Sequence, residues 1–132
     1  TEKTGVRMRI GGYKAKGVHL ALNFANGRYW HKGVSFSEEL FDSHDIYQKA
    51  LDILKKAPRE KVRILAVSCF NLTNNDFSQL QLFTDTQRKE KKVTSVDKIN
   101  ERWGDFVVSS GRTLLLKDTI HDRIAFGGVR EL

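Results

Sequence analysis

The sequence predicts an α+β domain in which a two-layer arrangement places a helix on one face of an antiparallel sheet. Three observations lead to this fold class. Residues 18–24 alternate between apolar and polar side chains, which is typical of a half-buried strand. Asn26-Gly27 follows at once, and this dipeptide favours a tight hairpin turn because both residues tolerate positive φ. Residues 42–57 then carry apolar side chains at spacings of three and four, which indicates an amphipathic helix.

The hairpin comes first among the predicted elements. The inward positions of its first strand are Val18, Leu20, Leu22 and Phe24. After the turn, residues 28–36 form the returning strand, where Gly33 indicates a bulge or a close backbone approach. His19 and His31 lie on the two strands and can pair across the hairpin, which favours a structural role over a ligand site.

A helix and a third strand follow the hairpin. Asp42 or Ser43 is placed to cap the helix, and Pro58 ends it. Residues 61–72 then form a strand that is apolar enough to lie centrally in a sheet. We expect its core face to carry Leu65, Val67 and Cys69, and its outer face to carry Ile64, Ala66, Ser68 and Phe70. Two outward apolar residues leave two alternatives: they contact the C-terminal tail, or the register is shifted by one residue.

Composition divides the chain into four segments. Residues 1–16 are predicted to be a basic linker, and residues 17–74 the sheet-bearing portion. Because three strands and one helix make a thin two-layer domain, a further strand and helix are expected upstream of Thr1. Residues 75–92 are predicted to be a flexible linker with one apolar patch, and residues 93–132 a tail with a short helix. Thr94 would cap that helix and Gly104 would end it.

Charge and cysteine content limit the classes of function. The chain has 132 residues and a formal net charge of +7, which favours a polyanionic partner such as a nucleic acid. The charge alone does not separate DNA from RNA or from an anionic membrane surface. The chain contains no apolar run long enough to span a membrane, and the partner we expect is not a membrane. One cysteine, Cys69, excludes an internal disulfide and fits a reducing cytoplasm.

No catalytic or metal site is indicated by the residues themselves. Asp42 and Asp45 are placed as helix-capping residues, and no glycine-rich phosphate loop is present. The sequence therefore predicts a binding chain with no catalytic residue, no metal site and no cofactor of its own.

Three stretches of this chain resemble the C-terminal "little finger" of Y-family translesion DNA polymerases, in the DNA polymerase IV and UmuC/ImpB/MucB/SamB group. They are GYKAKGVHLAL, VSFSEELFDSHDIYQKALDIL and KVRILAVSCFNL, at residues 12–22, 34–54 and 61–72. VDKINERWG and DRIAFGG in the tail are similar as well. The resemblance implies a sheet with the order β-α-β-β-α-β, whose first strand and helix would lie upstream. It also implies an error-prone parent enzyme that acts in damage tolerance and the SOS response, with its Mg²⁺-binding carboxylates in a palm domain outside this chain.

QLQLF, at residues 79–83, resembles the sliding-clamp-binding motif of bacterial proteins, Gln-Leu-x-Leu-Phe. The four defining positions are occupied by Gln79, Leu80, Leu82 and Phe83. A clamp pocket would take Leu82 and Phe83 as anchors, and Gln79 would hydrogen bond at its rim. The alternative is that the three apolar side chains fold back onto the domain itself.

The resemblance also implies that duplex DNA binds along the sheet through its backbone, without reading sequence. Candidate contacts are the cations and hydroxyls on or beside the strands, namely Lys14, Lys16, Lys32, Ser35, Arg63 and Ser68.

Two other functions stay open at this point. The chain could be a free-standing, sequence-neutral nucleic-acid-binding module, or a protein-interaction module without a polymerase parent.

Overall fold

The computed structural model describes residues 1–74, 84–104, 107–109 and 111. The chain divides into two compact units, Thr1–Lys91 and Lys92–Leu132, and the first unit carries the sheet. The elements in chain order are α1 (Glu2–Ile10), β1 (Tyr13–Phe24), β2 (Tyr29–Leu40), α2 (Ser43–Leu54), β3 (Val62–Asn74) and α3 (Thr84–Trp103).

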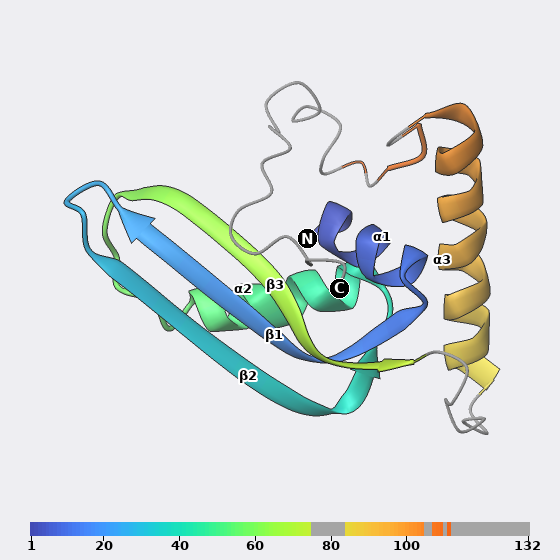
Figure 1. The fold of residues 1–132 in the computed structure, drawn as a ribbon, viewed down its shortest axis with the longest axis horizontal. Helices are drawn as coiled ribbons and strands as arrows, with labels where there is room; N and C mark the ends of the chain where they lie inside the picture. The colour runs from blue at the N-terminus through green and yellow to red at the C-terminus, as the bar shows by residue number, and fades with distance from the viewer. Residues whose placement is uncertain (75–83, 105–106, 110, 112–132) are drawn as a thin grey trace, which may run out of the picture. The chain divides into compact units, whose positions relative to one another are not determined.

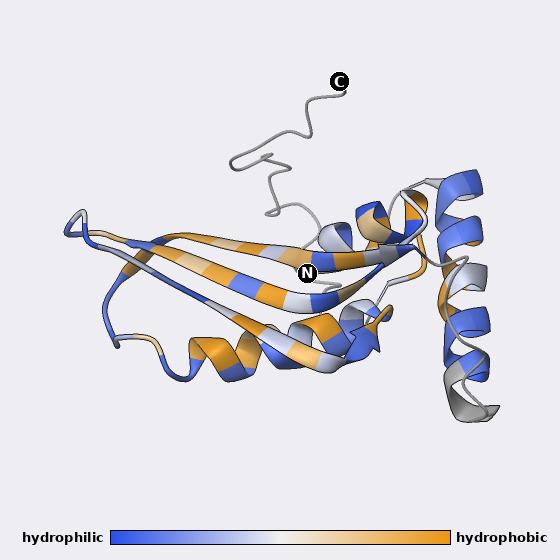
Figure 2. Ribbon diagram, turned by 60° about the horizontal axis from the view of Figure 1, so that its bottom comes forward, coloured by the Kyte–Doolittle hydropathy of each residue, from blue (hydrophilic) through white to orange (hydrophobic). Residues whose placement is uncertain are grey.

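The sheet is antiparallel and has the order β2-β1-β3, with β1 in the centre (Figure 1). Helix α2 runs along one side of the strands (Figure 2), and α1 contacts both α2 and β1. One apolar core joins these layers, with Val18 and Leu20 from β1, Ile46 from α2 and Met8 from α1 all buried. The predicted fold class, a sheet with helices packed on one face, is therefore confirmed.

The register of the third strand agrees with the sequence pattern. Leu65, Val67 and Cys69 pair with Leu22, Leu20 and Val18 of β1, so both sets of side chains point toward the helices. Val67 and Cys69 pack against the core, as expected. At the start of α2 the cap is Asp42, whose Oδ1 accepts a hydrogen bond from the backbone N–H of His44 at 2.9 Å.

The prediction that residues 1–16 form a linker is wrong. Residues 2–10 form α1, and β1 already begins at Tyr13. The helix has no apolar stripe, because Gly5 and Met8 are its only buried residues. Contacts with distant residues hold it instead: the Arg9 guanidinium donates to the carbonyl oxygen of Phe41 at 2.9 Å and to Ser43 Oγ at 3.2 Å. Residues 2–10 thus supply a second helix that packs with α2 on the sheet.

The prediction of a linker up to residue 92, followed by a short helix, is also corrected. Helix α3 begins at Thr84, ten residues before the expected cap at Thr94, and has 20 residues. It ends where predicted, at Gly104, whose φ of +110° suits glycine. Residues 75–83, which include the QLQLF motif, lie outside the described residues.

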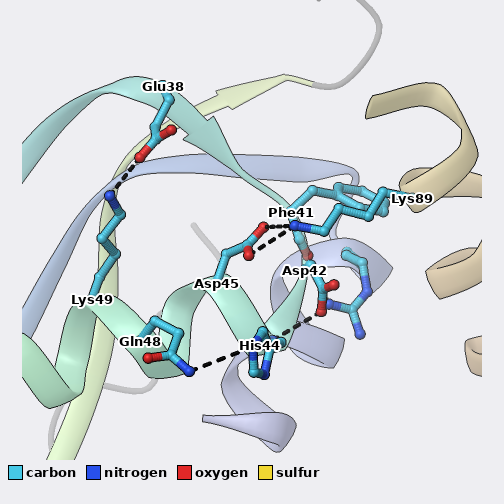
Figure 3. A network of polar contacts seen from close by, with 9 residues as sticks. Glu38, Phe41, Asp42, His44, Asp45, Gln48, Lys49 and Lys89 are labelled. Carbon is cyan, nitrogen blue, oxygen red and sulfur yellow. Dashed lines mark hydrogen bonds and ion pairs between the residues drawn. The ribbon is translucent and has the colours of Figure 1, made fainter. Parts of the chain in front are cut away.

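Two ion pairs join the beginning of α3 to the rest of the first unit. The Lys89 ammonium donates to both carboxylate oxygens of Asp45 on α2 at 2.9 Å (Figure 3). Lys14 Nζ on β1 donates to Glu90 Oε1 at 2.6 Å. Within the part of the chain that the structure describes, no helix is both long enough and apolar enough to cross a membrane.

Candidate nucleic-acid interface

The strand register defines a second sheet face, opposite to α1 and α2, which we call the open face. Side chains alternate along a strand, so the positions between the core residues point away from the helices. The open face is made of paired positions from all three strands: Gly17, His19, Ala21 and Asn23 on β1; Tyr29, His31, Gly33 and Ser35 on β2; and Ile64, Ala66, Ser68 and Phe70 on β3.

The open face combines small residues with aromatic, amide and imidazole side chains, and none of its paired positions carries a carboxylate. Glycine, alanine and serine occupy half of its paired positions, and lysine or arginine occupies none of them. Ser35 and Ser68 are exposed there, on β2 and β3. Such a surface lets another molecule approach the strand backbone closely, where hydroxyl, amide and imidazole groups are available for hydrogen bonds.

Phe70, a large apolar side chain on the open face, packs over a glycine of the neighbouring strand. A Cβ added to Gly17 would lie only 2.5 Å from Cζ of Phe70, so the ring covers the glycine on the neighbouring strand. The same ring would be 3.4 Å from a Cβ on Gly33 of β2. Phe70 is half-buried in this way, and the alternative of a register shift is excluded. Ile64, by contrast, stays 44% exposed.

Polar contacts across the strands order several open-face groups. His19 Nε2 and His31 Nδ1 lie 3.2 Å apart across β1 and β2. Asn71, with a φ of +52°, donates through Nδ2 to Ser35 Oγ at 3.2 Å. The sequence pattern suggested the histidine pair but gave it no binding role, and it gave no sign of Asn71.

The predicted cations do not gather on the open face. Lys14 is only 5% exposed, and its ammonium pairs with Glu90 and lies 4.0 Å from Glu39. Lys16 lies 3.6 Å from the same Glu39 carboxylate. We therefore leave Lys14 out of the set of candidate phosphate contacts, since its charge is already held inside the protein.

The two other predicted cations are accessible, although they lie beside the open face. Lys32 is exposed and pairs with Leu20, which places it on the helix side of the edge strand β2. Arg63 is exposed near the beginning of β3, next to an irregularity in the pairing with β1. Positive charge thus borders a neutral sheet surface.

The comparisons with known proteins agree with this architecture. A model of the impB/mucB/samB family C-terminal domain matches residues 1–82. The chain belongs to this family. The match includes α1, which supports the assignment of residues 2–10 to the domain.

Relatives of this impB/mucB/samB family chain are similar over most of its length. DNA polymerase IV of Pelotomaculum thermopropionicum is 24% identical over 119 residues, covering 89% of this chain and 30% of that protein. DNA polymerase IV of Dehalococcoides mccartyi strain CBDB1 is 28% identical over 121 residues, covering 89% of this chain and 31% of that protein. The chain therefore spans about a third of these relatives, and it corresponds to the C-terminal region of Y-family polymerases.

Proposed function

We propose that this chain is the duplex-DNA-binding and sliding-clamp-binding C-terminal portion of a translesion DNA polymerase, acting in damage tolerance in the cytoplasm. The observation that carries the proposal is the open face, where glycine, alanine and serine hold half of the paired positions and none is acidic, with exposed cations beside it. The relatives are named as DNA polymerases. This region would hold the DNA, while nucleotidyl transfer and its Mg²⁺ would belong to a palm domain outside these residues.

The physical basis of DNA binding is contact with the phosphate backbone. Contacts with phosphates and sugars position a protein without reading sequence, which suits an enzyme that copies any template. Ser35 and Ser68 offer hydroxyl donors on the open face, and Lys32 and Arg63 are the exposed cations beside it. Each phosphate that a cation neutralises adds about −0.9 to the slope of log affinity against log salt.

A matched pair of variants tests this face. Ser68→Glu places a carboxylate on the open face, and Gln48→Glu adds the same charge to an exposed position of α2. We expect Ser68→Glu to weaken binding of a labelled duplex by at least roughly tenfold, because like charges oppose each other across the interface. Gln48→Glu should change the affinity little. Equal losses in both variants, measured by fluorescence anisotropy, would reject the open face as the binding surface.

Binding to the sliding clamp is the second part of the proposal, and it rests on Gln79, Leu80, Leu82 and Phe83. The described elements on either side, β3 and α3, end at Asn74 and begin at Thr84. We expect the double substitution Leu82→Ala and Phe83→Ala to abolish clamp binding, because apolar anchors dominate such interfaces. Gln81→Ala, at the free position of the motif, is the control. Duplex affinity should be unchanged in both variants, so clamp binding by the double variant at the parent's level would refute this part.

Salt dependence separates duplex binding from the alternative of a protein-interaction module. Duplex binding that weakens steeply with salt and is equal for unrelated sequences supports the proposal. Absent or salt-insensitive duplex binding would instead indicate that the basic charge has no nucleic-acid partner.

A further inference from the structure

The open face contains one feature that a backbone-binding surface alone does not require, the pair His19 and His31. We propose that this pair is a phosphate contact that engages when it takes up a proton, so that duplex binding by the open face strengthens as pH falls from 8 to 5.5. This inference rests on the proposed function and adds a pH dependence to it.

The geometry places both imidazoles at the surface of the sheet. His19 pairs with Gly33 and His31 pairs with Ala21, so the two histidines are diagonal neighbours on adjacent strands. Their rings are 5.3 Å apart at an angle of 49°, and Nε2 of His19 lies 3.2 Å from Nδ1 of His31. Gly33 and Ala21, the residues that pair with His19 and His31, are too small to cover the rings.

Within the described part of the sheet, the neighbours of the pair on the open face carry no compensating charge. From β1 the groups facing it are Ala21 and Asn23, and from β3 it faces Ser68, which pairs with His19. On β2 the Tyr29 ring lies 5.4 Å from the His31 ring and is the other titratable group there. Lys32 comes from the opposite side of the same strand. Among the described paired positions of the open face, only the two histidines can become positively charged.

The chemistry of imidazole suits a change in duplex affinity between pH 5.5 and 8. Histidine is the side chain whose charge ordinarily changes between pH 5 and 8. With one added proton, the pair keeps an N–H⁺···N hydrogen bond between the two rings. The protonated pair also carries N–H donors on its two other ring nitrogens, Nδ1 of His19 and Nε2 of His31, and such donors suit a phosphate oxygen. By linkage, a phosphate that prefers the protonated pair must in turn favour its protonation.

The first test measures duplex affinity by anisotropy at constant ionic strength between pH 5.5 and 8. The parent chain should bind roughly fivefold more tightly at the lower pH, the size of a favourable surface ion pair. The double variant His19→Asn, His31→Asn should lose this gain. His44→Asn, at an exposed histidine on α2, should keep it. If the double variant keeps the full gain, the inference is overturned.

The second test follows the imidazole signals by NMR during a pH titration, with and without duplex. Duplex should move the titration midpoints of His19 and His31 to higher pH and leave that of His44 unchanged. Duplex binding without this movement rejects the histidine contact while the proposed DNA-binding function stands. Failure to bind duplex at any pH rejects the proposed function itself, and the inference with it. Circular dichroism of each variant checks that the sheet is intact.

Discussion

The ring of Phe70 on β3 occupies the space that a side chain on Gly17 of β1 would need. A Cβ at residue 17 would lie 2.5 Å from Cζ of the ring, well inside contact distance. We therefore expect Gly17→Ala to lower the free energy of unfolding by about 1–3 kcal/mol, the usual cost of overpacking. Urea denaturation measures this loss.

The same substitution in a Phe70→Ala chain shows whether the Phe70 ring causes the loss of stability in Gly17→Ala. In a Phe70→Ala chain the ring is gone, so adding the Gly17→Ala methyl should cost much less stability than in the parent. A double-mutant cycle gives this coupling directly. An equal cost in both backgrounds would contradict the packing of Phe70 on Gly17.

The contact between α1 and α2 predicts that a Gly→Ala substitution inside a helix, Gly5→Ala, destabilises the protein. Glycine inside a helix is ordinarily less favourable than alanine by about 1 kcal/mol, so Gly→Ala usually stabilises. At Gly5, however, a Cβ would lie 2.3 Å from Ser43 Oγ and 3.2 Å from Ser43 Cβ. We expect Gly5→Ala to lower the midpoint of thermal unfolding, and Ser43→Ala to relieve part of that loss. A rise in the midpoint would mean that the two helices do not approach closely at this position.

The parts of the fold that the sequence predicted are those with a local signal. Period-two alternation set the faces of β1 and β3, so Ser68 was correctly placed among the outward residues of β3. Asn26-Gly27 identified the hairpin, and the apolar stripe of α2 identified the helix that covers the sheet. Each of these signals depends on neighbouring residues only.

The parts that could not be predicted depend on residues far apart in the chain. Helix α1 is held by Arg9 and Gly5 against the beginning of α2, more than thirty residues away. Lys14 looked free because Glu90, its partner, is 76 positions further along the chain. An irregular register between Ala15 and Gly17 further separates the Lys14 end of β1 from the regular open face. No local pattern carries this information.

The ion pair between Lys89 and Asp45 should give a pH-dependent contribution to stability. The hydrogen bond to Asp45 holds the pKa of Lys89 above its ordinary value of 10.5. The folded state therefore keeps this proton more firmly than the unfolded state. The stabilisation is fully present below pH 10.5 and is lost as pH rises through the folded-state pKa.

Lys89→Gln tests that contribution. Because the pair lies near the surface, we expect a loss of about 0.2–1 kcal/mol at pH 8 in urea denaturation. The difference from the parent should shrink as pH is raised from 9 to 11.5. Lys61→Gln, at an exposed lysine before β3, is the control and should show a difference that is small at every pH. A Lys89→Gln difference that stays constant through pH 11.5 would argue against the ion pair.

The thiol of Cys69 provides a chemical test of the register of β3. Burial on the helix side of the sheet raises the pKa of this thiol above its usual value, and less of it is therefore thiolate at neutral pH. We expect slow reaction with a disulfide reagent at pH 7.5, and ordinary rates once urea has unfolded the chain, because the thiolate is the reactive form. The double variant Ser68→Cys, Cys69→Ala moves the thiol by one residue to the exposed open face. It should react at least roughly tenfold faster than the parent. Equal rates would place residues 68 and 69 in the same environment, which a strand with one covered face does not allow.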